Sequence, residues 1–599
     1  EAVTAINADP SDSAHYYTIS LKDDIACSGL RFSRNTTTIL GNDHTLVFNH
    51  GDAIHVGSGT ATHPVLILGG TEDMLTIKGN SSNDTYFIGV GAINGGTEYG
   101  TLKMCDGVTI TGATGNNYFG GAVTVAGGGK FEMDGGTIKE CGIDGGSVCF
   151  GGGLAVVNGI EFTMNGGSIQ DCFLKTAVDY TNASYLQYVF GFDYKAANNL
   201  LVNSGAGAGV FVSNGAVFKM NGGEIKNNTI STQDESVKSY GVGGGIAVLA
   251  NMDSLDITAR VEVTGGTIEG NKATLGGGGI AVCGMMPFAY AISNSYAPGG
   301  GSGTTTPGLV ISGTEENPVQ IKNNSADGWK DYSVGGGGIL LASLNDAAKV
   351  QIKNAEISGN KVTTNAPGGD DFYKNGNSTV NALPTAEQMS AAAKNAVISG
   401  WYEDKTENRY NEATAVKYTP EPSTTESLQL KAVKAAQYAV TFDWNDGSSR
   451  TETVSALAGT ALGDQMPAAP TRSGYTFTGW TTQADGQGTV FNKDTVVNGT
   501  LTVYAQWNKN SGGGDGGSTT YYYFAIEKVD AQDGHALNGA KFGLYLDGKQ
   551  VATATSNRSG IALFRVSASD YRKINAKSEL YYQELTAPEG YVVSGGKTG

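Results

Sequence analysis

One repeating unit of strands and glycine turns runs through residues 101–380 of this chain. Residues 151–172, GGGLAVVNGIEFTMNGGSIQDC, contain it whole: a glycine block, an apolar strand, a second strand, an Asn-Gly-Gly corner and a short strand on Ile169. Three residues after the isoleucine of each copy stands one aligned position. The aligned residues are Cys141, Cys172, Asn228, Asn271, Asn324 and Asn360. Because one copy cannot bury its own apolar residues, we expect the copies to stack.

The copies differ in length but not in strand pattern, as in a solenoid. The interval between aligned positions runs from 31 residues (Cys141 to Cys172) to 56 residues (Cys172 to Asn228). Glycine makes up 89 of 599 residues, which is about twice its usual share and suits a chain with many turns. We therefore predict an all-β protein led by a parallel β-helix, in which the aligned Asn side chains form an inward ladder between coils.

Earlier coils are expected before the clear repeats. Short β-branched strands at 17–21, 38–40, 45–48 and 65–68 are bounded by Gly, Asn and Asp. A helix is predicted over 385–395, where Thr385 and Gln388 have capping-box spacing, and it could cover the open end of the last coil. We predict that this first domain spans residues 1–420.

Charge and cysteine usage exclude several function classes. The net charge of −18 disfavours binding to nucleic acid and to anionic membranes. The sequence contains no run of 18 apolar residues, so we predict no membrane-spanning segment. Six cysteines without a Cys-x-x-Cys pair predict neither a disulfide scaffold nor a zinc site. Cys141 and Cys172 either replace Asn as small buried groups or bridge neighbouring coils. Five of the six histidines lie before residue 64, and we expect exposed or stacked rings there; no metal and no cofactor is predicted.

The insertions between repeats are the expected place for binding, because loops on one side of a solenoid commonly carry it. They cover 173–203, 231–240 and 285–307. The first is rich in aromatic residues, which we predict to bind a ligand. These residues are Tyr180, Tyr185, Tyr188, Phe190 and Tyr194.

The pair Asp370-Asp371 after Gly369 allows two interpretations. It is similar to the Gly-Asp-Asp string of polygalacturonases, but that family's Gly-His-Gly and Arg-Ile-Lys strings are absent. Glycosidases need two carboxylates roughly 5–9.5 Å apart, whereas neighbouring residues of a strand point to opposite faces. The interpretation we favour is a turn that ends the β-helix.

Two smaller domains are predicted after a Pro/Ser/Thr linker at 418–425. Residues 437–508 resemble a Listeria–Bacteroides repeat of the internalin B type, through the string PTRSGYTFTGW at 470–480 and LTVYAQW at 501–507. This resemblance implies a small β-grasp-like fold that serves as a spacer. We expect an aromatic core, with an exposed sugar-binding platform as the alternative. The aromatic residues are Tyr475, Phe477, Trp480, Tyr504 and Trp507.

After the linker SGGGDGGSTT (511–520), residues 521–599 resemble the prealbumin-like Cna-B/SpaA-type domains of Gram-positive pilins. The matching strings are FAIEKVD at 524–530 and YYQELTAPEGY at 581–591. The resemblance implies a β-sandwich in which Lys528 attacks an Asn side chain of the last strand and Glu584 acts as acid/base. Residues 592–599 contain no Asn, so we expect the acceptor strand to lie outside this sequence; a plain Lys528–Glu584 ion pair is the alternative.

The coil repeat is similar to right-handed β-helix repeats of bacterial surface proteins. Together the resemblances imply a Gram-positive (Firmicutes-type) cell-surface adhesin, extracellular and attached to the cell wall through an anchor outside this sequence. Its partner would be a host or microbial surface protein or glycan. Two alternatives remain: a carbohydrate-active β-helix enzyme, such as a polysaccharide lyase or glycosidase, on the same stalk, and a purely structural surface component.

Overall fold

The computed structural model describes most of residues 1–593 and divides them into two compact units, Glu1–Ala436 and Gln437–Gly599. The residues outside the description are 10–14, 50, 60–61, 81–85, 94–96, 116–118, 147, 159–160, 178–203, 214, 235–238, 250–258, 284–307, 329–334, 343–348, 364–367, 375–378, 394–395, 406, 425, 511–520, 532–533, 558–559, 576, 589 and 594–599. None of the described helices is long and apolar enough to cross a membrane.

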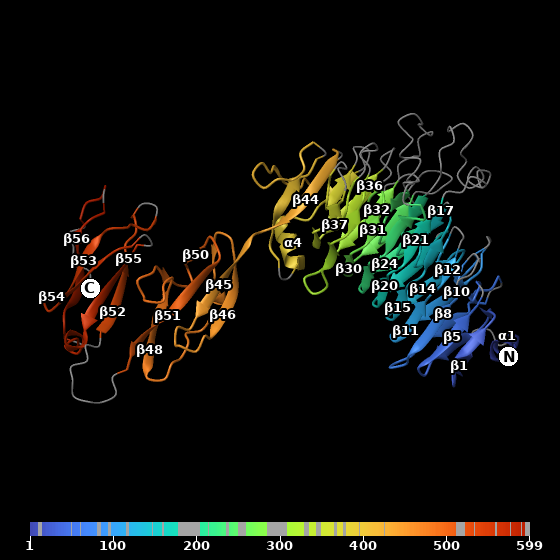
Figure 1. The fold of residues 1–599 in the computed structure, drawn as a ribbon, viewed down its shortest axis with the longest axis horizontal. Helices are drawn as coiled ribbons and strands as arrows, with labels where there is room; N and C mark the ends of the chain where they lie inside the picture. Colours follow the sequence, from blue (N-terminus) through green and yellow to red (C-terminus); the bar gives the residue numbers. More distant parts are fainter. Residues whose placement is uncertain are drawn as a thin grey trace. The chain divides into compact units, whose positions relative to one another are not determined.

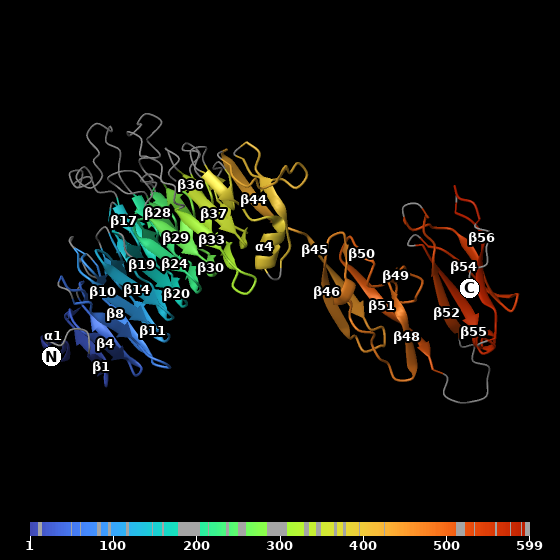
Figure 2. The same cartoon turned by 180° about the vertical axis from the view of Figure 1, so that it is seen from behind.

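The first unit is a parallel β-helix, as predicted, and three long sheets form its walls (Figures 1 and 2). Sheet A has eleven parallel strands: β1 (Tyr16–Ser20), β4 (Thr36–Leu40), β7 (Val65–Leu68), β10 (Gly100–Met104), β14 (Gly129–Met133), β19 (Glu161–Met164), β24 (Val217–Met220), β29 (Arg260–Val263), β33 (Leu309–Ser312), β37 (Lys349–Lys353) and β41 (Thr379–Ala382). Sheet B has ten: β2 (Ile25–Cys27), β5 (His44–Phe48), β8 (Leu75–Gly79), β11 (Val108–Thr111), β15 (Thr137–Lys139), β20 (Ser168–Gln170), β25 (Glu224–Lys226), β30 (Gly266–Glu269), β34 (Val319–Lys322) and β38 (Ala355–Ser358).

Sheet C closes the coil. Its parallel part contains β3 (Leu30–Phe32), β6 (Ile54–Val56), β9 (Ile88–Val90), β13 (Val123–Val125), β18 (Leu154–Val156), β23 (Val210–Val212), β28 (Ile246–Leu249), β32 (Ile280–Cys283), β36 (Ile339–Ala342) and β40 (Phe372–Lys374). Three antiparallel strands then extend it: β44 (Leu428–Lys434), β42 (Ile398–Glu403) and β43 (Lys417–Tyr418). The first unit therefore reaches Ala436, beyond the residue 420 that we set as its end.

Two shorter sheets lie between B and C in the chain order of the coils that contain them. Sheet D contains β12 (Thr114–Gly115), β16 (Gly142–Asp144), β21 (Phe173–Thr176), β26 (Thr229–Thr232), β31 (Lys272–Ala273), β35 (Ser325–Ala326) and β39 (Lys361–Val362). Sheet E contains β17 (Val148–Phe150), β22 (Ser204–Ala206) and β27 (Tyr240–Val242). Residues 173–176 are therefore strand rather than insertion, because they pair in register with β16 and β26.

Like residues stack along the bore because the register between coils is exact in the repeats. Phe131 pairs with Phe162, which pairs with Phe218, and their rings stack with centroids 4.9 and 4.8 Å apart. These side chains belong to one continuous apolar core that runs the length of the unit. The stacked rings combine burial with aromatic contact, so each coil is stabilised by both neighbours.

The predicted Asn ladder is confirmed. Asn228 Nδ2 donates to Asn271 Oδ1 at 2.9 Å, Asn271 donates to Asn324 at 2.9 Å, and Asn324 donates to Asn360 at 2.9 Å. Each Oδ1 also accepts the backbone N–H of the preceding rung, and each Nδ2 also donates to a backbone carbonyl of the preceding coil. Cys141 and Cys172 are buried free thiols at the first rungs.

The glycine blocks leave room for this ladder. A Cβ on Gly245 would lie 3.0 Å from Asn271 Nδ2 and 2.6 Å from the Gly279 carbonyl oxygen. Gly209 has the same relation to Asn228, at 3.0 Å. Glycine is therefore required at the third position of these blocks because a side chain would not fit there, and not because the backbone turns.

Helix α1 (Ala2–Ala8) was not predicted, whereas helix α4 (Ala386–Ala393) confirms the helix predicted over 385–395. The capping box forms: Thr385 N donates to Gln388 Oε1 at 2.9 Å and Gln388 N donates to Thr385 Oγ1 at 3.3 Å. In chain order α4 stands where the next sheet B strand would come, and it lies against β38. Its Met389 is fully buried in the core, so the helix closes the end of the bore.

The second unit contains two β folds. In the first, β46 (Thr451–Leu457), β45 (Gln437–Asp443), β51 (Leu501–Lys509), β48 (Tyr475–Thr481) and β49 (Val490–Phe491) form a mixed sheet in that order. A second small sheet pairs β47 (Thr460–Ala461) with β50 (Val496–Val497), and a short 3-10 helix η4 covers Gly463–Gln465. The parallel pair β45–β51 at the centre suits a β-grasp-like arrangement.

The last fold is a β-sandwich. One sheet pairs β52 (Tyr521–Glu527) with β55 (Ile561–Ser567), and the other orders β54 (Lys549–Thr555), β53 (Lys541–Leu546) and β56 (Leu580–Thr586). The short helix α5 spans Ala568–Tyr571. The sheets enclose one core cluster that includes Phe542, Phe564 and Val566.

Candidate functional site

The two large insertions leave the coil on either side of sheets E and C. We call residues 178–203 insert 1 and residues 284–307 insert 2. Insert 1 follows β21 of sheet D and precedes β22 of sheet E, while insert 2 follows β32 of sheet C and precedes β33 of sheet A. Both lie outside the described residues, and so do the predicted ligand-binding residues Tyr180, Tyr185, Tyr188, Phe190 and Tyr194.

The outer side of sheet C between these insertion points is apolar. Strand alternation turns Leu154 and Val156 toward the bore and Ala155 away from it. The residues in register with Ala155 are Phe211, Ala247, Ala281 and Leu340, and all are at most 1% exposed. Phe150 of sheet E stacks on Phe211 with ring centroids 4.6 Å apart.

In the first coils the same column is polar. Arg31 is in register with His55, whose Nε2 lies 2.8 Å from Glu98 Oε2. Arg31 lies 3.1 Å from the other oxygen of Glu98, and the Tyr86 hydroxyl lies 3.5 Å from His55 Nδ1. Burial lowers the pKa of His55 below its ordinary value, although Glu98 opposes this shift. A neutral imidazole between a carboxylate and a phenol can relay a proton.

Sequence reasoning missed this group, because Glu98 is 43 residues from His55 and only coil stacking brings them together. The early cluster of histidines was the one signal for it. Among the described residues, no three His, Cys, Asp or Glu side chains converge as metal ligands.

The pair Asp370-Asp371 lies at the C-terminal end of the β-helix and closes its last coil. Asp371 replaces the last glycine of a block, and its Oδ1 accepts from Asn360 N at 3.0 Å and Asn360 Nδ2 at 2.8 Å. Its Oδ2 accepts from Ala432 N at 2.8 Å. The carboxylate thus does what the next Asn would do and also joins β44 to the ladder.

Asp370 contacts other groups than Asp371 does, and both lie in the bend that precedes β40. It accepts from Val362 N at 2.9 Å and from Lys431 Nζ at 2.9 Å, and it contacts Arg409. Arg409 Nε also donates to the buried Asp404 at 2.8 Å. Both carboxylates therefore satisfy N–H groups at the end of the coil, which is the geometry of the turn that we favoured over catalysis. Sequence reasoning missed Asp404, Arg409 and Lys431, because their role depends on β44 turning back.

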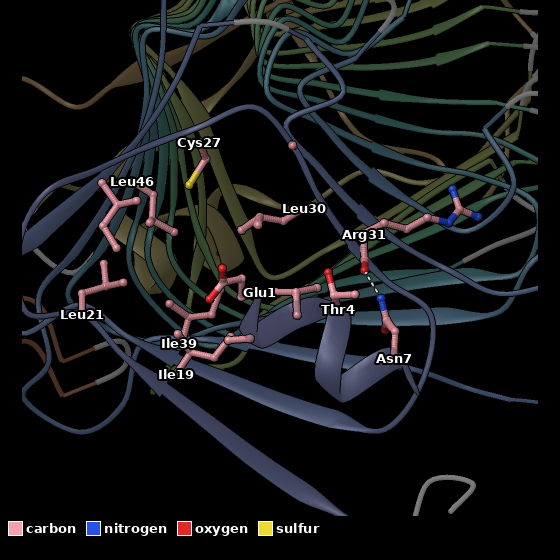
Figure 3. Close-up of a pocket in the computed structure, with 14 residues that line it drawn as sticks. Glu1, Thr4, Asn7, Ile19, Leu21, Cys27, Leu30, Arg31, Ile39 and Leu46 are labelled. Atoms are coloured by element: carbon pink, nitrogen blue, oxygen red, sulfur yellow. Dashed lines mark hydrogen bonds between the residues drawn. The ribbon is translucent and has the colours of Figure 1, made fainter. Parts of the chain in front are cut away.

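A cavity of about 410 Å³ opens at the N-terminal end of the bore, beneath α1 (Figure 3). Its walls are mainly apolar side chains of the first two coils, and α1 supplies polar groups at its edge. The principal wall residues are Ile19, Leu21, Ile25, Cys27, Ile39 and Leu46.

The prealbumin-like sandwich brings Lys528 and Glu584 together. Lys528 Nζ donates to Glu584 Oε2 at 3.2 Å, and their side chains are 21% and 1% exposed. Glu584 lies on β56, and Lys528 directly follows β52, so the pair links the two sheets. No residue of the described chain offers the acceptor Asn strand that the resemblance implies.

The predicted aromatic core of residues 437–508 is correct only in part. Trp480 is buried, and Phe477 and Trp507 pack against its cluster, but Tyr475 and Tyr504 are half-buried and outside it. Tyr504 points away because Val503 and Ala505 occupy the core face of β51. The rest of the cluster includes Val440, Phe442, Phe491 and Val497.

Comparison with known families identifies two segments. Residues 438–506 match the Listeria–Bacteroides repeat domain, and residues 523–598 match the SpaA prealbumin-like fold domain. Both are non-catalytic types of domain. No curated protein and no solved structure matches the chain.

Proposed function

We propose that the chain is the exposed part of a bacterial cell-surface binding protein, in which the β-helix presents a ligand-binding surface and the two smaller domains form a stalk. The observation that carries this is the order of folds: a β-helix with long insertions precedes a bacterial repeat domain and a pilin-type prealbumin-like domain. The proposal includes a Gram-positive source, an extracellular location and attachment to the cell wall outside this sequence.

The proposed ligand is a surface protein or glycan of a host or of another microbe, bound through inserts 1 and 2. Two features support this site. The inserts leave the coil on both sides of sheet C, and the aromatic residues of insert 1 suit stacking on sugar rings or packing in a protein interface.

Glycan and protein arrays probed with the labelled full chain test the proposal. We expect binding to a small set of related glycans or proteins. A variant with Tyr185, Tyr188 and Phe190 changed to Ser should lose that binding, whereas Tyr523→Ser in the last domain should keep it. Equal binding by both variants would place the ligand elsewhere, and the absence of any binding would favour a purely structural component.

A carbohydrate-active enzyme is the second candidate, favoured by the Glu98–His55–Tyr86 group. Pectins, mucin glycans and glycosaminoglycans incubated with the chain would then yield reducing ends or unsaturated products, and Glu98→Gln would abolish the turnover. Under the surface-binding proposal no product forms with either chain.

For the last domain we propose an internal crosslink between Lys528 and an Asn of a strand that follows this sequence. The neutral Lys528 amine would attack the Asn amide carbon, the Nζ–Cγ bond would form, and ammonia would leave. Glu584 would carry the proton from the lysine to the departing nitrogen. The 3.2 Å contact and the burial of Glu584 support these roles, because they hold the carboxyl group against the amine and away from water.

The intact mass of the longer natural protein tests the crosslink. It should fall short of the sequence mass by one ammonia, and Lys528→Arg and Glu584→Gln should each restore the full mass. An unchanged mass in a chain that contains the acceptor strand would leave Lys528 and Glu584 as an ion pair only.

A further inference from the structure

A row of aromatic and basic side chains lies at one end of the mixed sheet that contains β48 and β51. Phe477 of β48 is opposite Trp507 of β51, and Tyr475 is opposite Lys509. Phe477 and Trp507 still pack against the core cluster, whereas Tyr475 and Lys509 lie outside it. Because opposite residues of an antiparallel pair point to the same face, Tyr475 and Lys509 continue the face that carries Trp507.

The turn before β48 adds a guanidinium to this row. Tyr475 N donates to Arg472 O at 3.1 Å, and the guanidinium carbon of Arg472 lies 3.9 Å from the centroid of the Tyr475 ring. The same carbon lies 5.9 Å from the ring centroid of Trp507, and Arg472 Nη1 donates to the Asn445 carbonyl at 3.4 Å. These contacts hold the guanidinium in place, which reduces the conformational entropy that it would lose on binding a ligand.

We call Arg472, Tyr475, Trp507 and Lys509 the cationic ledge. Arg472 and Lys509 make no ion pair with a carboxylate in the part of the chain that the structure describes. Arg450 of the same domain differs, because it stacks on Trp444 at 4.1 Å and also donates to a carboxylate. The whole chain is acidic, with 57 Asp and Glu against 39 Lys and Arg. Two unpaired basic groups on one ledge therefore favour an anionic partner.

The combination of rings and basic groups describes this partner further. A guanidinium can donate two parallel hydrogen bonds to a carboxylate, and an ammonium group binds one as a compact charge. Tyr475 and Trp507 are half-buried, so they offer apolar contact beside these charges. A sugar ring with a carboxylate presents an apolar face and a charge in one rigid unit. An acidic peptide would lose more side-chain freedom for the same contact.

We propose that the cationic ledge binds an acidic glycan. The carboxylate of a uronate unit accepts hydrogen bonds from Arg472 and Lys509, and its sugar ring packs against Tyr475 and Trp507. This site would give the repeat domain a binding role besides that of a spacer. The site is separate from inserts 1 and 2 and does not depend on the function proposed for them.

Fluorescence polarisation with the full chain and a labelled hexamer of galacturonate tests the proposal. The fully methyl-esterified hexamer is the matched control ligand, because it has the same sugar rings without the charges. We expect the ester to bind roughly ten times more weakly than the acid, as the loss of a charge-assisted hydrogen bond predicts. Binding of the acid should also weaken as the salt concentration rises.

Variants of the ledge identify the site. Arg472→Gln should weaken binding of the hexagalacturonate roughly tenfold, because it removes the stacked guanidinium. Lys509→Gln should also weaken it, without a change in melting temperature, because Lys509 is exposed. Arg565→Gln is the matched control, since Arg565 of the last domain also stacks on a tyrosine, Tyr521, at 3.5 Å. This variant should bind as the natural chain does.

Three results would overturn the proposal directly: undiminished binding by both Arg472→Gln and Lys509→Gln, equal binding of the methyl ester, or no binding of the hexagalacturonate. Tighter binding of a hexaglutamate peptide would overturn it as well, and would identify an acidic peptide as the partner. The variant with Tyr185, Tyr188 and Phe190 changed to Ser separates this site from insert 1. It should keep the hexagalacturonate, and a loss of binding there would assign the glycan to the insert instead.

Discussion

At the residue scale, the coil depends on a pair of positions that are far apart in sequence: the third glycine of a block and the Asn of the same coil. Gly245 and Asn271 show the relation, because a Cβ on Gly245 would press on the Asn271 amide. Asn271 makes four hydrogen bonds in the ladder, so it cannot move away without leaving buried groups unsatisfied.

We therefore expect Gly245→Ala to destabilise the first unit by about 1–3 kcal/mol, the usual cost of overpacking a tight core. Chemical denaturation followed by fluorescence measures this. Gly59→Ala is the matched control, since nothing lies within 4 Å of its added Cβ. Equal stability of both variants would show that the Asn side chains shift to accommodate the added methyl group.

The pKa of Asp371 gives the C-terminal cap a pH dependence. Burial raises this pKa from 3.8 to about 7. The folded state then holds a proton that the unfolded state releases, so the contribution is fully present below pH 3.8 and is lost as the pH rises toward 7. The loss is on the order of 4 kcal/mol.

Thermal unfolding between pH 4 and pH 8 tests this against Asp371→Asn. We expect the natural chain to lose stability across the window and the variant to show a flatter profile. The variant should start from a lower stability, because its Nδ2 would face the Ala432 N–H that Oδ2 now accepts. Parallel profiles would assign the pH dependence to other groups.

At the element scale, α4 closes the C-terminal end of the bore. Met389→Ala should cost about 2–4 kcal/mol, because the side chain is fully buried and the helix cannot collapse onto β38 without losing its cap. Glu387→Gln on the exposed side should change stability by less than about 0.5 kcal/mol. Urea unfolding of both variants measures the difference; similar values would mean that α4 only lies on the surface.

The strands, α4 and the ladder could be predicted from the sequence because they repeat or carry a local signature. The Ile-to-Asn spacing marks each coil, and Thr385 with Gln388 marks the start of α4. The contacts that close the structure could not be predicted, because they join segments without a shared pattern. Glu98 reaches His55 across coils, and Arg409 and Lys431 reach Asp370 only after β44 reverses direction.

Within the smaller domains, motif strings predicted folds better than side-chain positions. The match over 438–506 agrees with the PTRSGYTFTGW string, yet Tyr475 and Tyr504 lie outside the core. A string shows which residues recur and not which face of a strand they occupy, so the β-bulge near Phe477 and Gly479 was invisible in it.

At the scale of the whole molecule, the first unit consists of a repeated frame and of inserts that differ from coil to coil. The frame consists of stacked apolar residues, the Asn ladder and the two end caps, and each part contacts the next coil. In chain order, insert 1 stands between β21 and β22, and insert 2 stands between β32 and β33. The proposed function places recognition in the inserts and stability in the frame.

The most direct test of that division replaces inserts 1 and 2 by short Gly-Ser turns in the full chain. The melting temperature of the first unit and binding on the glycan and protein arrays are then measured side by side with the natural chain. We expect a melting temperature within a few degrees of the natural value and complete loss of ligand binding. Retained binding, or unfolding of the β-helix without the inserts, would contradict it.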